Sequence, residues 1–152
     1  MFTVQNILDI AIRLESNGEK IYREARKHTD DAKLKALLSW IAEEECSHAR
    51  WFDDLKERIL QDEDHHIVSE MSRALVEDVI QGQAFSLQEV DFKAIDTPEK
   101  MIRAFIGFED DTVTFYKFLQ TFVHDSVTAA QLEQIVAEEE KHIRQLKDLL
   151  PG

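Results

Sequence analysis

Apolar residues recur at every third or fourth position along most of this chain, and they do not alternate with polar residues as in half-buried strands. This spacing predicts four long helices, over about 3–28, 31–61, 97–123 and 125–149. Three of them follow residues that commonly cap a helix, namely Asp30 or Asp31, Asp96 or Thr97, and Asp125 or Ser126. Few breakers interrupt the pattern, because the chain has only four glycines and two prolines.

The segment over 62–96 is too long for a tight turn, and part of it, over 67–81, could form a short helix. It separates a first pair of predicted helices (3–61) from a second pair (97–149), and a short turn joins the helices within each pair. We therefore predict an all-α fold with one domain over 1–152, in which a long crossover joins two αα-hairpins. That connectivity is the ferritin-like form of the four-helix bundle.

The two predicted hairpins resemble each other. Residues 12–55 align without a gap with the residues 94 positions later in the chain. The aligned pairs are Glu15 with Glu109, Tyr22 with Tyr116, Asp31 with Asp125, Glu45 with Glu139, and His48 with His142. Helix composition does not account for matched glutamates, tyrosines and histidines, which indicates that one hairpin has been used twice.

Each predicted helix carries one apolar stripe at helical spacing, and a glutamate interrupts each stripe near its middle. These glutamates are Glu15, Glu45, Glu109 and Glu139. Residues i and i+3 project from the same helix face, so His48 and His142 share the faces of Glu45 and Glu139. The two glutamates of each hairpin are equally distant from its turn, so all six side chains are expected at one level of the bundle.

Four carboxylates buried together, with no lysine or arginine on the same stripes, would be very costly. Two divalent cations cancel four carboxylate charges, and neutral imidazoles complete the ligand shell. Carboxylate-bridged di-iron and di-manganese proteins use this ligand set. The sequence therefore predicts a site for two metal ions at Glu15, Glu45, His48, Glu109, Glu139 and His142.

The four helices resemble those of the rubrerythrin group of ferritin-like di-iron proteins. The resemblance rests on IRLESNGEKIYREA (12–25), AEEECSHARWF (42–52), IGFEDDTVTFY (106–116) and AEEEKHIRQL (137–146). It implies two iron ions, with manganese or zinc as substitutes, bridged by Glu45 and Glu139. In that arrangement Glu15 and His48 complete the shell of one metal, and Glu109 and His142 complete that of the other.

The resemblance implies an oxidoreductase of the peroxidase or ferroxidase type, acting on peroxide, O₂ or Fe(II) in oxidant defence or iron handling. Full-length rubrerythrins carry a rubredoxin domain with four cysteines, whereas this chain has only Cys46, so reduction needs an external electron donor. Rubrerythrins also carry an extra glutamate three residues before the third-helix ligand, where this chain has Ile106. That glutamate serves the redox-linked movement of an iron, so its loss bears on peroxidase activity and leaves the six ligands complete.

Two other functions fit the same residues. One is a metal-binding or iron-sequestering helical protein without turnover, and the other is a helical interaction module whose metal is only structural. The oligomeric state separates these in part, because storage of a mineral core needs a large hollow shell. Oxidation chemistry with peroxide or O₂ separates them from an enzyme.

The net charge of the chain argues against some classes of binding partner. Its 18 lysines and arginines against 31 aspartates and glutamates give a net charge of −13, which argues against binding nucleic acid or an anionic membrane. No run approaches the roughly 18 apolar residues of a membrane span, and the N-terminal segment lacks the basic region of a signal peptide. We expect a cytoplasmic protein and a homodimer, since dimers are the commonest soluble assembly.

Tyr22 and Tyr116 each follow a predicted ligand by seven residues and lean back toward it. Each is interpreted either as a hydrogen-bond donor to a bridging carboxylate or an electron relay, or as a core tyrosine whose hydroxyl is satisfied elsewhere. The other acids near the ligands are expected to face solvent, namely Glu19, Glu43, Glu44, Glu138 and Glu140.

The remaining notable residues have simple interpretations. Cys46 is expected to be a packed small residue, and as a single cysteine it excludes an intramolecular disulfide. The pair His65 and His66 lies in a polar loop without the partners that a second metal site would need. Four aromatic residues lie off the apolar stripes and could pack the crossover or mark a dimer face, namely Trp40, Trp51, Phe85 and Phe92.

Overall fold

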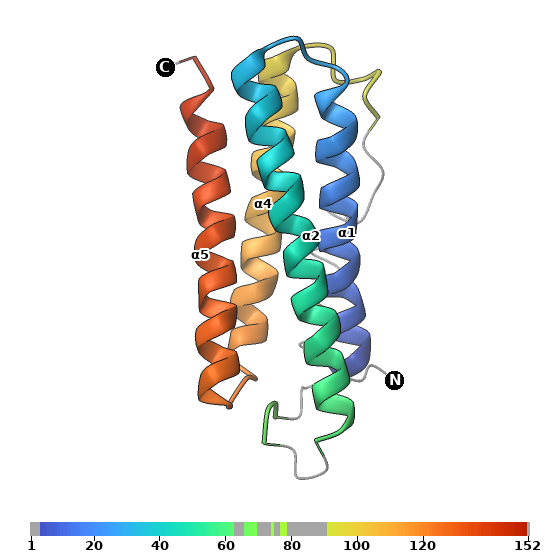
Figure 1. Ribbon diagram of the computed structural model, residues 1–152, viewed down its shortest axis with the longest axis vertical. Helices are drawn as coiled ribbons and strands as arrows, with labels where there is room; N and C mark the ends of the chain where they lie inside the picture. Colours follow the sequence, from blue (N-terminus) through green and yellow to red (C-terminus); the bar gives the residue numbers. More distant parts are fainter. Residues whose placement is uncertain (1–3, 63–65, 70–73, 75–76, 79–90, 152) are drawn as a thin grey trace.

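The computed structural model describes residues 4–62, 66–69, 74, 77–78 and 91–151. Its four long helices are α1 (Val4–Arg26), α2 (Ala32–Leu60), α4 (Pro98–Gln120) and α5 (Ser126–Asp148). They lie side by side with nearly parallel axes and form a four-helix bundle (Figure 1). The helical hairpins α1–α2 and α4–α5 are therefore confirmed. Because α2 and α4 run in the same direction, the segment between them connects opposite ends of the bundle (Figure 1).

The helix starts follow from side-chain caps that the sequence indicates. The Asp31 carboxylate accepts hydrogen bonds from the backbone N–H groups of Lys33 (2.9 Å) and Leu34 (3.1 Å) at the start of α2. Thr97 caps α4 ahead of its first-turn proline, and Asp125 caps α5. Such caps satisfy N–H groups that have no partner within the helix, and each stabilises its helix by about 1 kcal/mol.

Two boundaries differ from the sequence prediction for one shared reason. Val68 forms an antiparallel bridge with Val123, in which the Ser69 N–H bonds to the carbonyl of Phe122 at 2.9 Å. The bridge takes Val123 out of helical geometry, so α4 ends at Gln120 and not near 123. It also prevents a helix from starting at residue 67. Of the short helix predicted over 67–81, positions 74, 77 and 78 are helical, and 70–73, 75–76 and 79–81 lie outside the described residues.

The bundle core consists of two apolar clusters. One contains Leu8, Leu14, Phe52 and Leu119 toward one end of the bundle, and the other contains residues such as Leu38 and Phe105 toward the other end. Burying a large apolar side chain of this kind contributes about 1.5–3 kcal/mol. The middle level of the bundle, between the two clusters, is left for polar side chains.

Of the four aromatic residues predicted to lie off the apolar stripes, three pack against the bundle core, and Phe85 lies outside the described residues. Phe92 stacks on the His28 ring at 4.9 Å and packs with Trp40 against the second apolar cluster, while Trp51 packs against the first. Within the described part of the chain, no helix is both long enough and apolar enough to cross a membrane.

Candidate metal centre

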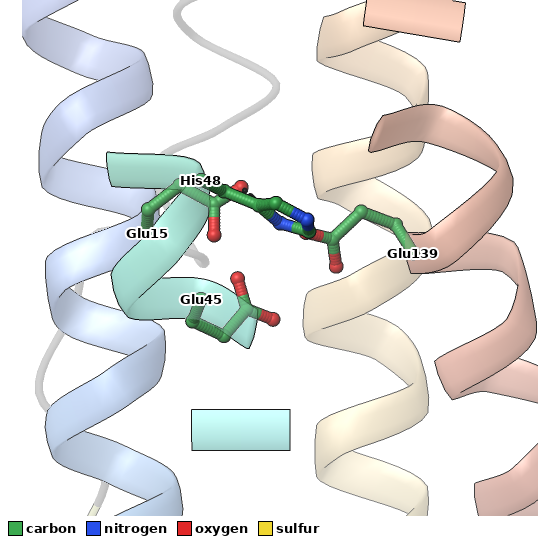
Figure 2. Close-up of side chains that lie close together, drawn as sticks. All are labelled: Glu15, Glu45, His48 and Glu139. Atoms are coloured by element: carbon green, nitrogen blue, oxygen red, sulfur yellow. Dashed lines mark hydrogen bonds and ion pairs between the residues drawn. The ribbon is translucent and has the colours of Figure 1, made fainter. Parts of the chain in front are cut away.

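The six residues predicted from the sequence meet at the middle level of the bundle. Each helix supplies one glutamate, and α2 and α5 each add a histidine; all six residues are at most 4% exposed. Their donor atoms form two groups within which all atoms lie within 4.8 Å of one another. The groups are Glu15, Glu45, His48 and Glu139, shown in Figure 2, and Glu45, Glu109, Glu139 and His142. Glu45 and Glu139 belong to both groups, as carboxylates shared between two metal positions would.

Both histidines turn the same ring nitrogen toward the centre. Nδ1 of His48 lies 2.8 Å from Oε1 of Glu139 and 3.4 Å from Oε1 of Glu15. Nδ1 of His142 lies 3.3 Å from Oε2 of Glu139 and 3.6 Å from Oε1 of Glu45. Nδ1 is therefore the ring nitrogen that can coordinate a metal, and Nε2 is left for another contact.

Burial and mutual repulsion govern the protonation of this centre. Desolvation, followed by the charges of Glu109 and Glu139, raises the pKa of Glu45 well above its ordinary value. Desolvation and the charge of Glu139 raise the pKa of Glu109 to about 7. Burial disfavours the charged form of His48, but hydrogen bonds and charge from Glu139 and Glu15 outweigh it and raise the pKa of His48 to about 12. The centre lacks positive charge of its own and draws protons to compensate.

Three buried carboxylate oxygens have no hydrogen-bond partner among the described residues, namely Oε2 of Glu15, Oε1 of Glu45 and Oε2 of Glu109. Burying such an atom without a partner costs about 1–3 kcal/mol or more when it is charged. Their neighbours are carboxylates and imidazole nitrogens, which are ligands for divalent transition metals. The residues present therefore fit a metal site, since a bound cation would satisfy these oxygens and offset the shared negative charge.

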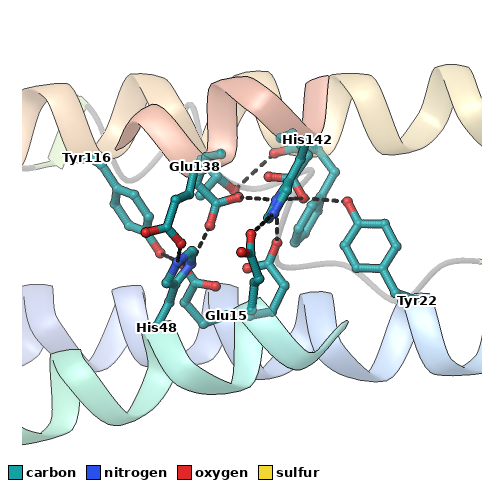
Figure 3. Close-up of polar contacts among 12 residues, drawn as sticks. Glu15, Tyr22, His48, Tyr116, Glu138 and His142 are labelled. Atoms are coloured by element: carbon teal, nitrogen blue, oxygen red, sulfur yellow. Dashed lines mark hydrogen bonds and ion pairs between the residues drawn. The ribbon is translucent and has the colours of Figure 1, made fainter. Parts of the chain in front are cut away.

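Each of the two tyrosines donates a hydrogen bond to a cluster glutamate of the other hairpin. The Tyr22 hydroxyl, from α1, donates to Oε1 of Glu109 in α4 at 2.5 Å, and the Tyr116 hydroxyl, from α4, donates to Oε1 of Glu15 in α1 at 2.5 Å. They flank the cluster at its two ends (Figure 3). Their carboxylate partners are the two that belong to a single group, and not the shared pair that the sequence interpretation proposed. Burial and the nearby carboxylates raise the pKa of both phenols, so each stays a hydrogen-bond donor.

The expectation that Glu44 and Glu138 face solvent is wrong. Oε1 of Glu44 lies 2.6 Å from Nε2 of His142. Oε2 of Glu138 lies 3.0 Å from Nε2 of His48 (Figure 3). Each glutamate points away from its own helix stripe, but the histidine of the opposite hairpin crosses the gap to reach it. A carboxylate on the outer nitrogen fixes the ring orientation and makes the inner nitrogen a better ligand. The internal repeat gives a sequence signal for this role, because Glu44 and Glu138 are also matched residues 94 positions apart.

The other acids near the centre lie outside it. The Glu19 side chain pairs with Arg23 at 2.9 Å, Glu43 is exposed, and Glu140 lies 3.9 Å from Lys117. These three agree with the expected polar face.

The remaining candidates take no part in either donor group. Cys46 is half-buried, and Ile106 is partly buried against both apolar clusters. His66 is exposed and belongs to neither group found among the described residues, while His65 lies outside them. Trp40 presents an edge-to-face contact to the His142 ring at 5.5 Å and receives Lys141 on its face at 5.2 Å.

The fold and the site define a four-helix bundle with a buried glutamate–histidine cluster at its centre, the architecture of the ferritin-like carboxylate proteins. Residues 6–150 match the rubrerythrin family, and the chain belongs to that family. The fold is similar to that of a Thermotoga maritima protein described as a ferritin-like diiron-carboxylate protein, with a TM-score of 0.71 and 21% sequence identity. That match covers 97% of this chain and 94% of the other. No curated protein matches the chain.

Proposed function

We propose that the buried cluster holds two iron ions and that the protein is an oxidoreductase acting on peroxide, O₂ or Fe(II). The observation that carries this proposal is the set of buried carboxylate oxygens without partners, which belong to glutamates of two donor groups that share Glu45 and Glu139. Membership of the rubrerythrin family supports iron over manganese or zinc. Iron bound there supplies two one-electron centres, which suits two-electron reduction of an O–O bond or oxidation of Fe(II).

The residues of the chain have distinct parts in this proposal. Glu45 and Glu139 belong to both donor groups and would be shared by the two irons, and the other four side chains of the cluster would complete the two shells. Glu44 and Glu138 orient the two imidazole rings from outside. The tyrosine hydroxyls fix the carboxylates of Glu15 and Glu109, and the apolar clusters above and below restrict water. Turnover with peroxide needs electrons from an external donor, and we propose that the working protein is a cytoplasmic homodimer.

The test is anaerobic loading with Fe(II), a count of bound metal, and stopped-flow mixing with peroxide or with O₂. The loaded protein should be oxidised faster than free Fe(II) at the same concentration. Glu139→Ala should abolish this reaction and lower occupancy at both positions, because it removes a ligand common to both groups. His48→Ala should mainly weaken one position, and Glu140→Ala, half-exposed beside a ligand, is the matched control.

Two outcomes would change the conclusion. Protein that binds two irons but reacts no faster than free iron would be a non-catalytic iron-binding protein. A Glu140→Ala variant as damaged as Glu139→Ala would show that the ligand assignment is wrong by one position. Size-exclusion chromatography of the same samples tests the homodimer, and a large shell would point to storage.

A further inference from the structure

A second polar feature lies between α1 and α2, in their halves nearer the turn that joins them. It is a hollow of about 380 Å³ lined by Arg23, Arg26, Lys27, Lys35 and Ser39, which we call the basic pocket. This volume lies within the range of about 300–1,000 Å³ found for small-molecule sites. The basic pocket shares no residue with the metal centre, so its chemistry is separate from the proposed oxidoreductase function.

The charges inside the basic pocket do not cancel. Arg23 pairs with Glu19 at 2.9 Å, and Lys27 pairs with Glu24 at 3.2 Å. Arg26 and Lys35 have no carboxylate within ion-pair distance in the described part of the chain. Four cationic side chains against two carboxylates leave about two positive charges facing one hollow, on a chain whose net charge is −13.

The internal repeat shows that this feature belongs to one hairpin only. At the positions 94 residues later, the five lining residues correspond to Lys117, Gln120, Thr121, Ala129 and Glu133. Only one of the four cations is kept, and an acid replaces the serine. The metal-centre residues obey the repeat, whereas the basic pocket breaks it, so packing needs common to both hairpins do not explain the cations.

We propose that the basic pocket binds a small, doubly charged oxyanion of the phosphate class. A phosphate monoester carries about −1.5 to −2 charges at neutral pH, which is close to the surplus of about two positive charges. A guanidinium such as that of Arg26 can donate two parallel N–H bonds to a phosphate, and the Lys35 ammonium supplies a point charge. The Ser39 hydroxyl adds a neutral donor to the same hollow.

The experiment is isothermal titration calorimetry of the full chain with inorganic phosphate and, separately, with a nucleoside monophosphate, at constant ionic strength. The test variant is Arg26→Gln with Lys35→Gln. The matched control is Arg144→Gln with Lys147→Gln, which removes the same charge from exposed positions of α5. The test variant should bind either probe at least about tenfold more weakly, because it loses two charge-assisted contacts to the anion. The control should stay within about twofold of the parent.

Binding of either probe that is lost selectively in the test variant supports the proposal, and the two probes distinguish free phosphate from a phosphate ester. Binding of neither probe, or equal weakening in both variants, overturns it. Both variants should keep the metal stoichiometry of the parent, so failure here is separable from failure of the di-iron proposal.

Discussion

Glu109 makes the metal-free protein sensitive to pH. Its pKa is about 7 in the fold, against an ordinary value of 4.5, because of burial and the neighbouring charge of Glu139. The unfolded chain therefore releases this proton first as pH rises, and unfolding becomes easier between about pH 4.5 and pH 7. The difference corresponds to about 3 kcal/mol of unfolding free energy. The raised pKa of His48 acts in the same direction at higher pH, because its stabilising contribution is complete below 6.5 and is lost as pH rises toward 12.

Glu109→Gln tests this reasoning, because it keeps the side-chain size and an oxygen that can accept from Tyr22 but cannot ionise. The metal-free variant should be more stable than the metal-free parent at pH 8, by up to about 3 kcal/mol, and less dependent on pH between 4.5 and 7. Urea unfolding followed by circular dichroism, with chelator present, measures both quantities. With metal supplied, the variant should instead be less stable than the parent, since it lacks one ligand. Asp110→Asn, an exposed neighbour, is the control and should change stability by less than about 0.5 kcal/mol.

A metal-free Glu109→Gln protein that is less stable than the parent at pH 8, or equally dependent on pH, would refute the argument. Either result would mean that repulsion among the buried carboxylates is not a dominant cost.

Three further results are expected. Tyr116→Phe should lower the free energy of unfolding by about 1–3 kcal/mol in urea titrations, because a buried oxygen of Glu15 loses its donor. Glu44→Gln should weaken metal binding by about 10–100-fold in calorimetry, because the histidine it contacts loses a charged orienting partner, whereas exposed Glu43→Gln should not. Loading with Fe(II) should quench tryptophan fluorescence, and Trp40→Phe should remove most of that change, since this ring lies against a proposed ligand.

Much of the bundle follows from local signals in the sequence. Asp31 and Asp125 mark helix starts because capping depends on residues only two or three positions apart. The meeting of the six cluster residues follows from helical spacing together with the repeat. The bridge between Val68 and Val123 has no such signal, because it pairs residues far apart in the chain and depends on where the crossover lies.

The contact of Glu44 with His142 also could not be predicted from local sequence signals. The face of a helix follows from periodicity, so the sequence predicts that Glu44 lies off its own stripe, as the structure shows. What reaches that face from another helix depends on the length and rotamer of the opposing side chain, here the imidazole of His142. Likewise, leaning back along the helix suggested a shared carboxylate as the partner of each tyrosine, but the spacing between hairpins selects Glu109 for Tyr22. Periodicity along the sequence therefore does not predict which side chains of the two hairpins contact each other.

The division of the donor groups between hairpins has a mechanical consequence. Each group takes three residues from one hairpin and a single glutamate from the other, Glu139 in the first group and Glu45 in the second. A filled centre would therefore act as a double cross-link between two hairpins that already meet in the apolar clusters and in the crosswise tyrosine hydrogen bonds. A chain cut between the hairpins should stay together while loaded and come apart more readily when a chelator removes the metal. Each half would keep three of the ligands, and neither would keep a complete shell.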